Sequence, residues 1–132
     1  MKKPIHKHLL LFANINKFPS KDDEKVVTTF MERLVEKIQM KLIAGPITKF
    51  VSDQGNVGWT STLLLSTSHV AMHIWNEWGN MQLDVYSCKE FDESIVIAHI
   101  KETFDATKIK YRILNRDGGV NDEAGLKIQQ WA

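Results

Sequence analysis

The chain has 132 residues and a mass of 15.2 kDa, a length that fits one domain and leaves little room for a second. Hydrophobic residues make up 43% and charged residues 25%, which excludes a disordered or low-complexity protein. The formal net charge of +1 gives no overall attraction to nucleic acid or to an acidic membrane surface. One cysteine, Cys88, is present, so an intramolecular disulfide cannot form and a reducing compartment is indicated. No apolar run approaches the roughly 18 residues that cross a bilayer, so we expect a cytoplasmic protein with no membrane and no nucleic-acid partner.

The first part of the chain predicts a strand followed by a long helix. Residues 8–15 form an apolar run that ends at asparagines and Pro19, which is typical of a buried strand. Apolar residues then recur at three- and four-residue spacing up to Leu42, which predicts an amphipathic helix of about five turns. Ser20 is the expected N-cap. Gly45-Pro46 is expected to end the helix, because proline cannot continue its hydrogen-bond ladder.

The rest of the chain predicts mainly strands. They are expected over 47–51, 59–66, 69–75 and 81–88, with a second helix from Asp92, a last strand over 109–114 and a loosely attached tail over 116–132. In 69–75, alternation places Val70, Met72 and Ile74 on one face, and His69, Ala71, His73 and Trp75 on the other. This order predicts an α+β fold, a two-layer sandwich of a mostly antiparallel sheet with helices on one face. A symmetric partner would cover the other face, so we expect a homodimer.

Reactive side chains are densest between Ser66 and Cys88. On periodicity alone, His69 and His73 can be ordinary, partly buried strand residues. Their spacing would suit two zinc ligands on a helix, but the segment is a predicted strand, so no metal site is expected. A serine hydrolase is disfavoured because the Gly-x-Ser-x-Gly elbow is absent. Cys88 remains either a small buried hydrophobe or a nucleophile beside His73 on a neighbouring strand.

The order of residues from Leu65 to Cys88 is more specific than the composition of this segment. It is similar to the pattern Glu-Ser-His-x-x-x-His-x-Trp-Pro-Glu-x-Gly followed by Asp-x-x-x-Cys, which is typical of the prokaryotic S-adenosylmethionine decarboxylase family. The matching residues are Ser68, His69, His73, Trp75, Glu77, Gly79, Asp84 and Cys88. Gly58-Trp59-Thr60 and His8-Leu9 also look like their family counterparts. The resemblance covers about residues 6–115 of one domain expected to span residues 1–132.

The resemblance implies a self-processing, pyruvoyl-dependent enzyme. In such proteins a serine hydroxyl attacks the preceding carbonyl, and elimination then cuts the chain and turns the serine into an amino-terminal pyruvoyl group. If this chain follows the family pattern, cleavage falls between Thr67 and Ser68, and the pyruvoyl cofactor derives from Ser68. The ketone binds the substrate amine as a Schiff base and accepts electrons as carbon dioxide leaves. His73 would support proton removal during processing, and Cys88 would return a proton to the substrate. The implied substrate-binding residues are Phe50, Trp75 and Glu77.

Three features depart from the family pattern. Thr67 stands where glutamate is usual, Asn76 replaces a proline and restores a backbone donor, and the loop 52–56 looks longer than usual. The favoured interpretation is a decarboxylase of S-adenosylmethionine that serves polyamine (spermidine) biosynthesis. Two alternatives stay open: a processing-defective homologue that binds a ligand or a partner protomer, and an arginine or ornithine decarboxylase that uses the same pyruvoyl group.

Overall fold

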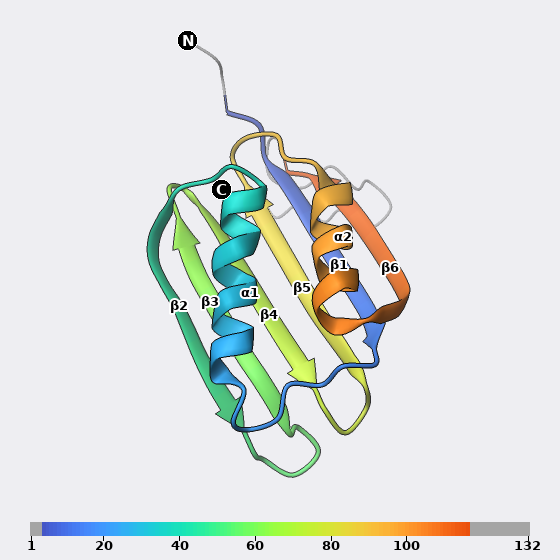
Figure 1. Ribbon diagram of the computed structural model, residues 1–132. Helices are drawn as coiled ribbons and strands as arrows, with labels where there is room; N and C mark the ends of the chain where they lie inside the picture. The colour runs from blue at the N-terminus through green and yellow to red at the C-terminus, as the bar shows by residue number, and fades with distance from the viewer. Residues whose placement is uncertain (1–3, 117–132) are drawn as a thin grey trace, which may run out of the picture.

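Two helices cover one face of a six-stranded sheet in the computed structural model, which describes residues 4–116 (Figure 1). The elements in chain order are β1 (Lys7–Ile15), α1 (Glu24–Lys37), β2 (Leu42–Val51), β3 (Gly58–Leu65), β4 (Ser68–Trp75), β5 (Asn80–Ser87), α2 (Glu93–Phe104) and β6 (Ala106–Asn115). The strand order is β2-β3-β4-β5-β1-β6, and all neighbouring strands run antiparallel. The predicted two-layer α+β sandwich is therefore confirmed.

The sequence predicts a loosely attached tail over 116–132 and no membrane-spanning segment. Apart from Arg116, the expected tail over 116–132 lies outside the described residues. Within residues 4–116, no helix is both long and apolar enough to span a bilayer.

The core lies between the helices and one face of the sheet, as the alternation in β4 predicts. Leu9, Phe30, Leu34, Met72 and Ile100, from both helices and two strands, are at most 2% exposed. Burial of such a side chain contributes roughly 1.5–3 kcal/mol relative to leaving it in water. The opposite side of the sheet, called the open face below, carries His8, Leu10 and Phe12 of β1, His69, Ala71, His73 and Trp75 of β4, and Gln82, Asp84 and Tyr86 of β5.

The predicted first helix is wrong at both ends. The N-cap is Asp23, while the Ser20 hydroxyl accepts a hydrogen bond from the Asp22 N–H at 3.3 Å within the preceding turn. The helix ends at Lys37, before Gln39 adopts a left-handed φ of 59°. Such a residue closes a helix, and hydrophobic spacing does not reveal it. Gly45-Pro46 consequently lies inside β2, where the pairing register with β3 shifts.

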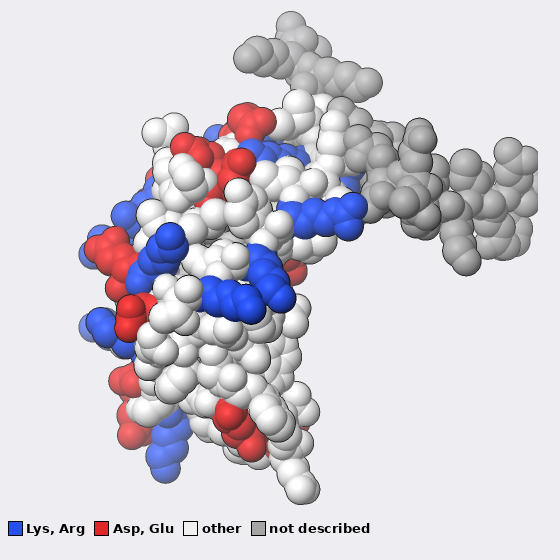
Figure 2. Space-filling model, turned by 90° about the vertical axis from the view of Figure 1, so that its right-hand side faces the viewer, with Lys and Arg blue, Asp and Glu red and all other residues white. Residues whose placement is uncertain are grey.

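The sheet has two edge strands, β2 and β6. In β6, the exposed side chains of Lys108, Lys110 and Arg112 occupy alternate positions. Figure 2, which looks onto this side of the molecule, shows lysine and arginine side chains across the edge. Charges on an edge strand oppose pairing with another strand.

Candidate active site

A tight turn between β3 and β4 places Ser68. Leu65 pairs with Ser68 across this hairpin, so Ser66 and Thr67 alone form the connection. Thr67 has a left-handed φ of 57°, which is rare for a β-branched residue and costs on the order of 1–3 kcal/mol. The peptide bond between Thr67 and Ser68, where the sequence predicts cleavage, therefore directly follows a strained residue.

Cys88 lies beside this turn because β5 runs antiparallel to β4 and carries the chain back past its start. Its backbone N–H donates to the Ser68 hydroxyl oxygen at 3.1 Å. The Thr67 hydroxyl lies 2.8 Å from the Cys88 sulfur and 2.6 Å from the Ser66 carbonyl oxygen. Hydrogen bonds from the Thr67 and Ser68 side chains lower the pKa of the Cys88 thiol below its ordinary value. The structure thus brings three predicted residues, Thr67, Ser68 and Cys88, into direct contact.

His73 lies elsewhere. Its side chain is exposed on the open face, with Nδ1 3.1 Å from the Thr60 hydroxyl, and it pairs with Gln82 of β5. Five residues of extended strand separate it from Ser68, a distance of about 16 Å at 3.3 Å per residue. The odd spacing also puts their side chains on opposite faces. The hypothesis that Cys88 lies beside His73 is therefore wrong for a single chain.

The predicted substrate-binding aromatics occupy different faces of the sheet. Trp75 is half-buried on the open face, its ring centroid 5.8 Å from that of His73, and the two residues line a cavity of about 110 Å³. Phe50 instead pairs with the buried Trp59 on the helix-covered face, where the two rings meet edge-on at 5.2 Å. The structure thus joins Trp75 to His73 and separates both from Phe50.

Glu77 takes part in a set of hydrogen bonds that hold the loop 52–57 in place. Its carboxylate accepts a hydrogen bond from the Val57 N–H at 3.1 Å, and the Trp75 indole N–H donates to the Asn56 side-chain oxygen at 3.1 Å. The Asn76 N–H donates to the Val57 carbonyl oxygen at 2.8 Å, which confirms the backbone donor expected from the replacement of proline. The long loop is therefore anchored directly against the cavity lined by Trp75.

The open face also carries a polar network that the sequence analysis does not predict. His8 Nε2 lies 3.1 Å from an Asp84 carboxylate oxygen, and His69 Nε2 lies 3.7 Å from the same oxygen. Tyr86 packs against both imidazoles, with ring centroids 5.7 and 5.5 Å away, and its hydroxyl is 2.8 Å from His6 Nδ1. The alternation of the strands could have placed these side chains on one face, but only the β1–β5 and β4–β5 registers show that they meet.

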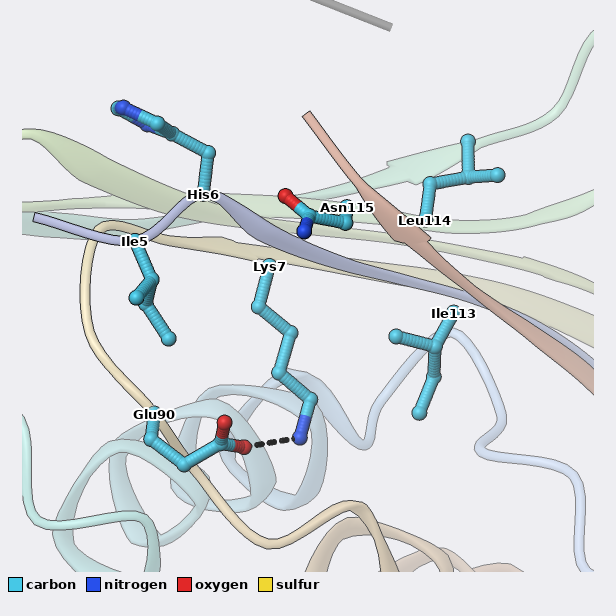
Figure 3. A pocket seen from close by; sticks show the side chains of 7 residues that line it. All are labelled: Ile5, His6, Lys7, Glu90, Ile113, Leu114 and Asn115. Carbon is cyan, nitrogen blue, oxygen red and sulfur yellow. Dashed lines mark hydrogen bonds and ion pairs between the residues drawn. The ribbon is translucent and has the colours of Figure 1, made fainter. Parts of the chain in front are cut away.

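A second cavity, of about 300 Å³, lies where β1, β6 and the segment before α2 meet (Figure 3). Lys7 crosses it to form an ion pair with Glu90, drawn as the dashed line, and its Nζ is also 2.8 Å from Glu93. Burial alone would lower the pKa of Lys7, but the hydrogen bonds and charges of the two glutamates outweigh it and raise that pKa. This cavity contains none of the residues predicted to act in catalysis, and its charges satisfy one another.

Comparison with known proteins places the chain in a family. The family model for S-adenosylmethionine decarboxylase matches residues 10–117. An S-adenosylmethionine decarboxylase proenzyme of Thermoplasma acidophilum is 33% identical over 110 residues, which cover 79% of this chain and 80% of the relative. One from Clostridium botulinum (strain Langeland) is 23% identical over 110 residues, covering 83% and 91%. The crystal structure of the adenosylmethionine decarboxylase from Aquifex aeolicus VF5 shares the fold, with a TM-score of 0.70 at 20% identity over 98% of this chain and 100% of that chain. The chain therefore belongs to the S-adenosylmethionine decarboxylase family.

Proposed function

We propose that the chain is a proenzyme that cuts itself between Thr67 and Ser68 and then decarboxylates S-adenosylmethionine for polyamine biosynthesis in the cytoplasm. The relatives that match it are named S-adenosylmethionine decarboxylase proenzymes, and a single domain spanning residues 1–132 would carry the activity. One observation carries the proposal: the Ser68 hydroxyl, the strained Thr67 and the Cys88 thiol meet at one turn.

The groups at this turn suit self-cleavage. The Ser68 oxygen attacks the Thr67 carbonyl carbon, the C–N bond breaks as an ester forms, and the Ser68 nitrogen takes the hydroxyl proton. Loss of the Ser68 α-proton then breaks the bond from Cβ to the ester oxygen and leaves Thr67 as a carboxylate. Hydrolysis of the remaining enamine releases ammonia and leaves a pyruvoyl group. The Cys88 N–H holds the attacking oxygen at 3.1 Å, and relief of the strain at Thr67 favours bond breaking.

The same residues suit the decarboxylation that follows. A pyruvoyl group at position 68 would supply a ketone that captures the substrate amine and accepts electrons. Cys88 would hold a proton on its sulfur and deliver it to the substrate α-carbon, a task suited to a thiol whose pKa is lowered below its ordinary value. Trp75 offers a flat ring for the purine, but about 23 Å of extended strand separates it from Ser68 in one chain, so this role needs the Trp75 of a second copy. Glu77 and Phe50 remain candidate substrate contacts on the strength of the family resemblance.

The position of His73 favours a homodimer. A general base must approach within about 3 Å of the proton it removes, whereas about 16 Å of strand separates His73 from Ser68 in one chain. A second copy packed against the open face would bring its His73 toward the exposed side of the turn, where Thr67 contacts Cys88. This face also exposes Leu10 and Leu64, at 38% and 54%, which burial against a partner would stabilise.

An intact mass spectrum of the purified protein tests self-cleavage. We expect a 67-residue amino-terminal fragment and a 65-residue carboxy-terminal fragment whose amino terminus is blocked. Ser68→Ala should remain one chain, because it lacks the attacking oxygen. A single intact mass for the unaltered chain after prolonged incubation would support the processing-defective alternative instead.

Parallel assays with carboxyl-labelled S-adenosylmethionine, arginine and ornithine test the substrate. Saturable release of carbon dioxide from S-adenosylmethionine is expected, since Trp75 beside the open cavity can stack on a purine. Release only from arginine or ornithine would overturn the nucleoside assignment and leave the pyruvoyl mechanism in place.

A further inference from the structure

Thr67, the residue before the expected cleavage point, contacts Cys88 through its hydroxyl. Glutamate, the usual residue at this position in the family, has no hydroxyl and would make a different contact. The Thr67 hydroxyl lies between two acceptors, the Ser66 carbonyl oxygen at 2.6 Å and the Cys88 sulfur at 2.8 Å. The Cys88 sulfur is in turn 3.7 Å from the same Ser66 carbonyl oxygen. Three polar atoms therefore form a triangle directly against the strained turn.

The Thr67 hydroxyl has one proton, so it can donate a hydrogen bond either to the Ser66 carbonyl oxygen or to the Cys88 sulfur. When Cys88 is a neutral thiol, its S–H can donate to the Ser66 carbonyl, and it needs no donor of its own. When Cys88 is ionised, rotation of the Thr67 hydroxyl gives the sulfur a donor at 2.8 Å. A donor available to only one protonation state favours that state. The lowered pKa of the Cys88 thiol, with Thr67 as its largest cause, agrees with this geometry.

We propose that Thr67 is a positioning residue for Cys88: its hydroxyl holds the sulfur at the scissile turn and favours the thiolate in the uncleaved chain. Thr67 makes this contact with Cys88, the residue after β5, from a backbone with a left-handed φ of 57°. The effect of this contact on the chemistry after cleavage rests on the proposed function, but the contact itself exists before any cleavage. Glutamate at this position would present an acceptor instead of a donor when ionised, and so would disfavour the thiolate.

Alkylation of the cysteine across a pH series tests the proposal without any enzymatic activity. Because Cys88 is the single cysteine, the rate of its reaction with iodoacetamide reports on this thiol alone. The measurements use the full-length Ser68→Ala chain, which cannot cleave, with and without changes at Thr67. The midpoint of the rate against pH reports ionisation, and the plateau at high pH reports accessibility.

In this background, Thr67→Val should raise the midpoint by about one pH unit, which corresponds to one lost hydrogen bond to a charged group. Thr67→Ser should restore the parent midpoint, because it keeps the hydroxyl. Thr62→Val, which removes a hydroxyl elsewhere on the same hairpin, should leave the midpoint unchanged. Thr67→Ala serves as a second hydroxyl-free variant if the valine variant does not fold.

Two results would overturn the proposal: an unchanged midpoint in a folded Thr67→Val or Thr67→Ala chain, or a raised midpoint in Thr67→Ser equal to that of the valine variant. Failure of the proposed function gives a different result. In that case the unaltered chain stays uncleaved by mass spectrometry, whatever the Cys88 midpoint does.

Discussion

Ser68, Thr67 and Cys88 show how few atoms the proposed chemistry requires. The Cys88 backbone N–H lies 3.1 Å from the Ser68 hydroxyl oxygen, and the Cys88 sulfur lies 2.8 Å from the Thr67 hydroxyl. The N–H acts on the attacking oxygen, while the sulfur is assigned to the later proton return. These two roles of Cys88 are separable, since only one of them depends on the side chain.

Replacement of Cys88 by alanine should separate cleavage from turnover. Cys88→Ala keeps the backbone N–H that contacts Ser68, so mass spectrometry should still find both fragments. Decarboxylation should fall by about 10²-fold or more, which is typical for loss of a proton-transferring group. If the cleaved Cys88→Ala protein turns over at the rate of the unaltered enzyme, Cys88 is not the proton donor.

The two aromatic candidates for substrate binding should respond differently to truncation. Phe50 packs on the buried Trp59, so Phe50→Ala should lower the free energy of unfolding by roughly 3 kcal/mol with a small effect on KM. Trp75 lines the open-face cavity, so Trp75→Ala should raise KM by an amount equivalent to about 1–3 kcal/mol, as one lost base stack costs. Urea unfolding and KM measured on both variants check this. A raised KM in a Phe50→Ala protein of unchanged stability would favour the role that the family resemblance implies.

At the scale of the elements, α1 and α2 are joined by a buried histidine. His99 of α2 is 5% exposed; its Nε2 donates to the Phe30 carbonyl oxygen of α1 at 2.9 Å, and the two rings stack at 4.4 Å. Burial lowers the pKa of His99 below its ordinary value, because a charged imidazole would lose its hydration there. The helix pair therefore depends on a neutral side chain.

This contact predicts a pH dependence of stability. Near neutral pH, His99 is uncharged in both the folded and the unfolded chain, so its contribution is constant. As the pH falls below the ordinary histidine value of about 6.5, the unfolded chain takes up a proton that the folded chain does not. Stability is therefore lost from that pH downward and levels off below the lowered pKa of the folded state.

Urea unfolding of the parent and of His99→Gln at pH 7.5 and pH 5.5 measures this loss. The glutamine amide can still donate a hydrogen bond but does not titrate, so the parent should lose more stability on acidification than the variant. Equal losses in the parent and in His99→Gln would contradict the assignment.

At the scale of the whole molecule, the strands decide which residues can cooperate. Both helices cover one face (Figure 1), charged side chains line the β6 edge (Figure 2), and the open face carries His73 together with exposed leucines. A second copy on the open face would hide these leucines and complete the proton-transfer groups of each turn. The dimer would then be a requirement of processing as well as of stability.

Co-production of two inactive variants tests this requirement. Ser68→Ala lacks the attacking oxygen and His73→Ala lacks the base, so neither alone should cleave efficiently. In a mixed dimer, the His73→Ala chain keeps its own Ser68 and receives His73 from its partner, so its two fragments should appear by mass spectrometry. Mixed dimers that yield no fragments would show that His73 acts within its own chain. Full cleavage of the His73→Ala chain produced alone would show that His73 is not needed for processing.

The sequence by itself determined the family, the fold class and the two faces of the central strands. The alternation in β4 separates Val70, Met72 and Ile74 from His73 and Trp75 because a strand has a side-chain period of two, and the structure has the same division. The spacing from Ser68 to Cys88 carried the family resemblance without any knowledge of the pairing register.

Only the tertiary structure decided which of these residues meet. Contact between Cys88 and Ser68 follows from the β4–β5 register, and the separation of His73 from Ser68 follows from the same strand being straight. Phe50 faces Trp59 because the β2–β3 register pairs these two residues. The left-handed turns at Gln39 and Thr67 lack a sequence signal, since neither residue type favours that conformation and the surrounding hydrogen bonds impose it. Local patterns record which face a side chain takes, whereas register, strain and contact depend on segments far apart in the chain.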